Sequence, residues 1–149
     1  MFEIKIRMMN EEVARKLLAP LGLGTPEAEE TGVHIYLEDE ETTRKIKDVN
    51  GTLTYVVAQR HGPGFTYTTE PISPQQRSDL ETHYPPAVTL TIHRTVWNTG
   101  NVSIELNRIP DDGIFLELHG DDFECLKTVA RQIGFSEQHY LTRSYDKLA

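Results

Sequence analysis

Short segments in which apolar and polar residues alternate, joined by tight turns, follow one another along most of this chain. In the first of them, residues 1–8, apolar side chains alternate with Glu3, Lys5 and Arg7. A period of two is typical of a strand with one apolar and one polar face. The Asn-Gly pair at positions 50–51 is the strongest short-range signal for a β-hairpin. Because such turns connect neighbouring strands directly, the pattern favours an antiparallel sheet or barrel over a doubly wound parallel sheet.

The same signals predict seven or eight strands and two or three helices. We expect strands over residues 1–8, 32–37, 42–47, 52–59, 65–70, 87–97, 102–109 and 114–119. We expect helices over residues 10–21, 73–82 and 123–133, with further partial helix in residues 136–149. The acidic runs at 27–30 and 38–41 are expected in solvated loops. No linker divides the sequence, so residues 1–149 are expected to form a single α+β domain.

Composition argues against several classes of function. The net charge of −8 disfavours nucleic-acid binding, which rests on a basic surface. The single cysteine, Cys125, excludes an intramolecular disulfide and a cysteine-based zinc site. No apolar run reaches the roughly 18–20 residues of a membrane span, and the charged start does not resemble a signal peptide. We therefore expect a cytoplasmic protein with no membrane partner.

Polar residues share one face on several predicted strands, and two interpretations of these faces are open. The sets are Glu3, Lys5 and Arg7; Lys45 and Lys47; Thr91, His93 and Thr95; Glu105 and Asn107; and Glu117 and His119. The polar faces either contact solvent, as in many antiparallel sheets, or line the interior of a closed barrel. In a barrel, buried Lys and Arg require an anion, and added Glu residues indicate a divalent cation. A triphosphate with magnesium or manganese meets both requirements.

The six histidines give a weaker signal. They lie at positions 34, 61, 83, 93, 119 and 139, without the His-x-His or helical i, i+4 spacing of metal sites. Four of them are expected to be scattered surface or hydrogen-bonded residues. His93 and His119 lie on the polar faces that would point into a barrel, where an imidazole contacts a metal or a phosphate.

Several short motifs, in a fixed order, resemble those of one family. Glu3-Ile4-Lys5 is similar to the end of an opening Glu-x-Glu-x-Lys signature, and residues 44–47 take the place of Leu-Arg-Ile-Arg. Residues 102–120 follow the pattern of an acid-bearing strand, a short turn and Phe-Leu-Glu-Ile-Glu, and residues 144–148 are similar to a terminal Ser-Tyr-x-x-Leu. Together these motifs resemble the CYTH superfamily, the triphosphate tunnel enzymes. That superfamily includes class IV adenylate cyclases, thiamine triphosphatases and inorganic tripolyphosphatases.

The resemblance implies an antiparallel eight-stranded β-barrel with a few flanking helices, enclosing a tunnel for a triphosphate. It implies a phosphorylated small molecule as partner, with a divalent metal, manganese or magnesium, as cofactor. Carried over position by position, it gives Lys5, Lys45, Lys47 and Arg94 as substrate-binding residues, and Arg7 is added because it follows Lys5 on the same polar face. It gives Lys5 and Glu117 as catalytic residues, and Glu3, Glu117 and His119 as metal ligands.

The chain also departs from the family pattern. Met1 stands where the signature has its first Glu, Val56 where a Lys is usual, Asn107 where an Asp is common, and His119 where a second late Glu is expected. Fewer carboxylates weaken a magnesium site, and an imidazole favours manganese, zinc or no metal. Three hypotheses therefore stay open: a metal-dependent phosphohydrolase or nucleotidyl cyclase, a catalytically weakened anion-binding protein, and a structural or partner-binding barrel. The sequence also leaves a homo-oligomer open.

Overall fold

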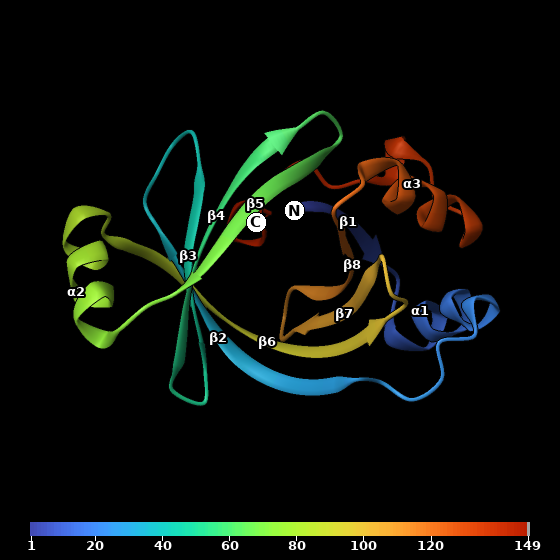
Figure 1. Ribbon diagram of the computed structural model, residues 1–149, viewed down its shortest axis with the longest axis horizontal. Coiled ribbons are helices and arrows are strands. Elements are labelled where there is room, and N and C mark those ends of the chain that lie inside the picture. Colours follow the sequence, from blue (N-terminus) through green and yellow to red (C-terminus); the bar gives the residue numbers. More distant parts are fainter. Residues whose placement is uncertain (149) are drawn as a thin grey trace.

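The chain forms a closed barrel of eight antiparallel strands (Figure 1), as predicted. A computed structural model describes residues 1–148. Around the barrel the strands follow the order β1-β5-β4-β3-β2-β6-β7-β8. Their bounds are β1 Phe2–Met8, β2 Ala28–Leu37, β3 Thr43–Val49, β4 Thr52–His61, β5 Gly64–Pro71, β6 Pro86–Asn98, β7 Ser103–Ile109 and β8 Gly113–Gly120.

Three α-helices lie outside the barrel: α1 Glu11–Leu18, α2 Pro74–His83 and α3 Phe123–Gln132. Each begins where the sequence carries a capping residue. The side chains of Asn10 and Asp122 accept backbone N–H groups of the first turns of α1 and α3, and Ser73 forms a capping box with Gln76 at the start of α2. Single 3₁₀ turns lie at Ala19–Leu21, directly after α1, and at Glu137–His139 and Tyr145–Lys147, both after α3. Among residues 1–148, no helix has the length and apolarity needed to cross a membrane.

The helices cover outward apolar faces of the strands. Helices α1 and α3 pack on one side of the barrel, over an apolar cluster that includes Ile4, Ile6, Leu116 and Leu118. Helix α2 lies on the opposite side (Figure 1), and its Leu80 packs against the outward residues of β2, β3 and β4. Burial of each such large aliphatic side chain contributes roughly 1.5–3 kcal/mol. The outer faces thus carry much of the apolar packing, which leaves the inner faces free for polar residues.

The structure differs from the sequence-based expectations in two places: the face of β6 that points inward and the residue at which β2 begins. Arg94 points inward, so Thr91, His93 and Thr95 lie on the outer face, and the ring of His93 is bonded to the Thr31 hydroxyl at 2.8 Å. The orientation follows from Trp97, which shares this outer face and is buried in the cluster beneath α1. Strand β2 begins earlier than expected, so residues 28–30 are part of the sheet and do not form a loop.

The C-terminal segment packs beside β1 and reaches into the barrel. The backbone N–H of Leu141 donates to the carbonyl of Lys5 at 2.8 Å, and Tyr140 pairs with Ile6. Tyr145 is then buried against Phe115, with the two ring centroids 4.7 Å apart. These contacts place a tyrosine hydroxyl from the end of the chain inside the barrel.

Candidate functional site

Strand register brings the predicted polar residues together inside the barrel. Lys5 on β1 lies opposite Glu117 on β8, and Glu117 lies opposite Glu105 on β7. On the other side of the barrel, Lys47 on β3 lies opposite His34 on β2. Because side chains on one face recur every two residues, these pairs all line the interior.

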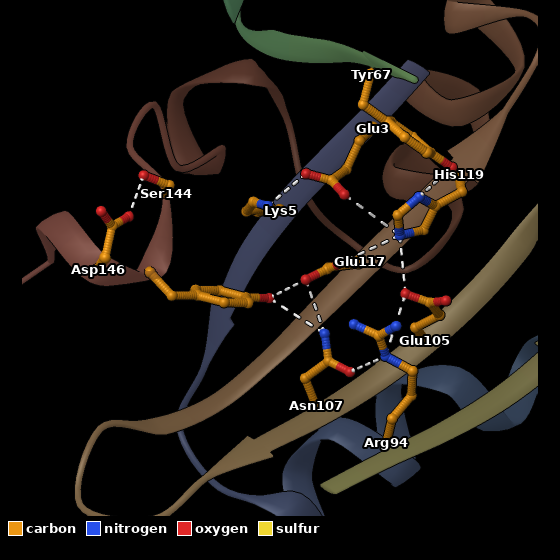
Figure 2. Close-up of polar contacts among 11 residues, drawn as sticks. Glu3, Lys5, Tyr67, Arg94, Glu105, Asn107, Glu117, His119, Ser144 and Asp146 are labelled. Carbon is orange, nitrogen blue, oxygen red and sulfur yellow. Dashed lines mark hydrogen bonds and ion pairs between the residues drawn. The ribbon is translucent and has the colours of Figure 1, made fainter. Parts of the chain in front are cut away.

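A cluster of three carboxylates surrounds His119 (Figure 2). Its Nε2 atom lies 2.8 Å from Glu117, 2.9 Å from Glu105 and 3.5 Å from Glu3. Its Nδ1 atom is bonded to the hydroxyl of Tyr67 at 2.8 Å. Tyr67 therefore fixes the ring so that Nε2 faces the acidic groups. We call Glu3, Glu105, Glu117 and His119 the acidic cluster.

Three members of the acidic cluster, Glu105, Glu117 and His119, have shifted pKa values. Burial alone would lower the pKa of His119, but Glu105 and Glu117 raise it well above its ordinary value. Burial would raise the pKa of Glu117, but Lys5, His119 and Arg94 hold it well below the usual range. The pKa of Glu105 is also lowered, against the effect of burial, by His119 and Arg94. The carboxylates of Glu105 and Glu117 are therefore ionised at neutral pH although they are buried.

A chain of hydrogen bonds holds Glu117 in place. One carboxylate oxygen accepts the Asn107 amide at 2.8 Å and also the hydroxyl of Tyr145. The side-chain carbonyl oxygen of Asn107 in turn accepts a hydrogen bond from Nε of Arg94 at 2.9 Å (Figure 2). Asn107, which the sequence showed only as a lost acid, thus connects a buried cation to a buried carboxylate. An aspartate in its place could not donate to Glu117.

Lys5 is neutralised within the site. Its ammonium is paired with Glu3 and lies 4.8 Å from the ring centroid of Tyr145. Burial acts to lower its pKa, but Glu3 and Glu117 outweigh burial, so the pKa of Lys5 is raised. Lys5 thus stays charged and stabilises the acidic cluster.

Lys45 and Lys47 have no such partner. Lys45 is only 8% exposed, and its ammonium lies 5.5 Å from the ring centroid of Tyr36. Among residues 1–148, no carboxylate oxygen lies within 4.0 Å of either ammonium. Burial, Lys5 and Lys47 lower the pKa of Lys45 to about 7, and burial and Arg94 lower that of Lys47. A buried amine that is costly to protonate is stabilised by an anion.

Arg7 does not join these groups. It lies exposed near the end of β1, where its guanidinium donates to the carbonyl of Asp112 at 3.2 Å and lies 4.9 Å from the ring centroid of Phe115. Alternation along the strand gives the face of a residue but not its depth in the barrel. Arg7 therefore shares a face with Lys5 and lies at the rim. The prediction that it points into the same cavity as Lys5 and Lys45 is not met.

The acidic cluster has the composition and spacing of a cation site. One ligand atom from each of Glu3, Glu117 and His119 lies within 4.8 Å of the others. Oε2 of Glu105 is also buried, and it has no well-oriented hydrogen bond despite its short distance to His119. An available carboxylate oxygen fits a divalent cation, and Nε2 of His119 can join it by giving up the proton that its raised pKa indicates. The sequence marked Glu105 as the acid of a strand in the family pattern but gave it no role, and it gave no signal for Tyr67, which lies in no motif.

Known structures share this fold at low sequence identity. No protein-family model matches the chain, and no curated protein is found to be similar to it. The PH1012 protein from Pyrococcus horikoshii OT3 matches with a TM-score of 0.82 at 20% identity, over 99% of both chains. A "putative adenylate cyclase" from Vibrio parahaemolyticus matches with a TM-score of 0.70 at 17% identity, over 97% of this chain and 94% of that one. Another from Bacillus halodurans has a TM-score of 0.64 at 18% identity, over 88% and 86%.

Proposed function

We propose that the barrel interior binds a triphosphate-containing small molecule or a polyphosphate, as a divergent relative of the triphosphate tunnel enzymes. The observation that carries this proposal is the pair Lys45 and Lys47, two inward-facing amines that no carboxylate neutralises among residues 1–148. Placing two unpaired ammonium groups in a protein interior costs several kcal/mol. A polyanion between them offsets that cost, since each phosphoryl oxygen accepts charge-assisted hydrogen bonds.

The net charge of −8 does not oppose this proposal. Many of the acids lie outside the barrel, for example in the run at residues 38–41, whereas the unpaired amines lie within it. The local potential of an enclosed site depends on the groups that line it more than on the charge of the whole molecule. A cationic wall at Lys45 and Lys47 therefore attracts an anion into an acidic protein.

The acidic cluster supports a more specific proposal, namely metal-dependent chemistry on a phosphoryl group of the bound molecule. Glu3, Glu117 and His119, with Glu105, would hold manganese or magnesium, which neutralises phosphate charge and polarises a phosphoryl group when bound. Lys5 would place its charge beside the phosphate chain, and Arg94 would hold Asn107 and Glu105 in position. The likeness in fold to two proteins called putative adenylate cyclases supports this class of chemistry.

A non-catalytic anion-binding protein is the second candidate, and one observation favours it. Glu3 is already paired with Lys5, and Glu117 already accepts from Asn107, Tyr145 and His119. Carboxylates engaged in this way have fewer free lone pairs for a hard cation such as magnesium. On this basis we expect weak turnover, with manganese more effective than magnesium.

Thermal unfolding with added ligands tests the proposal. Tripolyphosphate, ATP and thiamine triphosphate are each added with magnesium, manganese or EDTA. A ligand at 100 times its Kd stabilises by ~2.7 kcal/mol, which raises the Tm of a chain of this length by roughly 5–10 °C. We expect this rise in the unmodified protein and in Lys16→Met, a control on the exposed face of α1, but not in Lys45→Met/Lys47→Met. No rise with any ligand would contradict the proposal, and a rise without phosphate release or cyclic product would favour the binding protein.

A further inference from the structure

His34 is a deeply buried histidine for which the sequence indicated no function. It lies on β2, faces the interior and is only 2% exposed. Its register partners are Lys47 on β3 and Leu90 on β6. It therefore lies on the same wall of the barrel as the two unpaired lysines.

The Nδ1 atom of His34 is buried and has no hydrogen-bond partner among residues 1–148. Buried polar atoms in folded proteins are nearly always hydrogen-bonded, so an atom left without a partner needs an explanation. Glycine at position 32 leaves room on the Nε2 side of the ring: a Cβ atom at Gly32 would lie 3.8 Å from Nε2 and 2.9 Å from Val49. The absence of a side chain at Gly32 thus leaves the space that the ring and Val49 share.

The charges around His34 are mostly positive. Burial, Lys45, Arg94 and Lys47 all lower the pKa of His34 far below its ordinary value, against the opposing effect of Glu117. The imidazole is therefore neutral when the interior contains no anion. A neutral ring still carries one N–H, so it adds a hydrogen-bond donor to this wall without adding repulsion between cations.

We propose that His34 is a ligand-contacting residue whose Nδ1 donates a hydrogen bond to an anionic oxygen of the polyphosphate held by Lys45 and Lys47. This inference rests on the proposed function and adds a third side chain to the cationic wall. A phosphoryl oxygen accepts from both an ammonium and an imidazole N–H, so one group can satisfy the lysines and the unpartnered Nδ1 together. The ligand would also raise the pKa of His34, because it places negative charge beside the ring.

Nitrogen NMR of the unmodified protein tests the contact directly. The histidine rings are labelled with ¹⁵N, the His34 signals are assigned by their loss in His34→Gln, and tripolyphosphate is added in the presence of EDTA. We expect the Nδ1 resonance of His34 to shift on saturation, while the signals of His93, on the outer face, stay unchanged. A Tm raised by tripolyphosphate with no change at His34 would overturn this inference and leave the proposed function intact. If the Tm does not rise either, the proposed function itself fails.

Affinity measurements on variants give an independent test. His34→Phe keeps a ring but removes the donor, and we expect tripolyphosphate to bind about tenfold more weakly. His34→Gln keeps an N–H donor and is expected to recover part of that loss, whereas His93→Phe serves as the control with unchanged affinity. Equal affinity of His34→Phe and the unmodified protein would contradict the contact. If His34→Phe does not fold, the NMR measurement still decides.

Discussion

The charged side chains in the barrel interior form two groups: those that face an opposite charge and those that do not. Glu3, Glu117 and Lys5 belong to a network in which each charge faces an opposite one. Lys45 and Lys47 face the same interior without a counter-ion within 4.0 Å among residues 1–148. Under the proposed function this asymmetry favours an anion, and it costs stability while no anion is bound.

Replacing Lys45 tests that cost. Its pKa falls from 10.5 to about 7 on folding, so the unfolded chain binds more protons between these values. The free-energy cost that protonated Lys45 imposes on folding is therefore at its full value below about pH 7. This cost disappears as the pH rises towards 10.5. We expect Lys45→Met to be more stable than the unmodified protein by about 1–4 kcal/mol at neutral pH, with a smaller gain near pH 10. Urea unfolding at both pH values measures this, and a gain that does not depend on pH would show that Lys45 is charged when folded.

Replacing His119 tests the acidic cluster. His119→Glu brings a fourth carboxylate beside Glu3, Glu105 and Glu117, and like charges in a buried site repel each other. We expect a large fall in Tm in EDTA that magnesium reverses, because a divalent cation neutralises the added charge. His93→Glu, on the outer face, is the control and should show no such dependence on magnesium. An equal response to magnesium in both variants would mean that the cluster is not a cation site.

At the scale of elements, local signals were enough to predict most helices and strands. Asn10 and Ser73 mark helix starts because capping depends on a few adjacent residues. Asn50 and Gly51 both have positive φ, as a two-residue hairpin requires. The inward face of β6 could not be predicted in this way, since both of its faces carry polar residues and burial of Trp97 beneath α1 decides between them.

The C-terminal segment was also beyond sequence reasoning in its detail. The motif at residues 144–148 supported the family resemblance, but insertion of Tyr145 beside Glu117 depends on contacts between residues far apart in the chain. The same holds for Tyr67, which orients His119 from β5. The sequence thus indicated most of the charged groups of the site, whereas the neutral groups that position them emerged only from the structure.

Tyr145→Phe tests the contribution of this segment. The change removes the hydroxyl that donates to Glu117 and keeps the ring that packs on Phe115. A lost hydrogen bond to a buried charged group costs about 1.5–3 kcal/mol. We expect that loss in urea unfolding, and a smaller one in Tyr140→Phe, whose hydroxyl makes no side-chain hydrogen bond within residues 1–148. Equal effects of the two changes would contradict a specific contribution of the Tyr145 hydroxyl.

At the scale of the whole molecule, the barrel separates apolar packing from polar chemistry. The three α-helices bury apolar outer faces, so the strands can turn Glu, Lys, Arg and His inward. The sheet closes through two residue pairs between β1 and β5, and this closure holds the inward side chains at fixed spacings. We therefore expect an anion to bind inside the barrel, at amines that change protonation when it binds.

Proton uptake on binding tests this central claim most directly. Calorimetric titration of tripolyphosphate near pH 8, in two buffers with different ionisation enthalpies, measures the protons exchanged on binding. Lys45 is mostly neutral at this pH, and a bound anion restores its charge. The matched control is Lys45→Arg, which keeps a permanent charge at this position. We expect both proteins to bind, with the unmodified protein taking up about one proton more. Absence of binding, or equal proton uptake by the two proteins, would contradict an anion site at Lys45 inside the barrel.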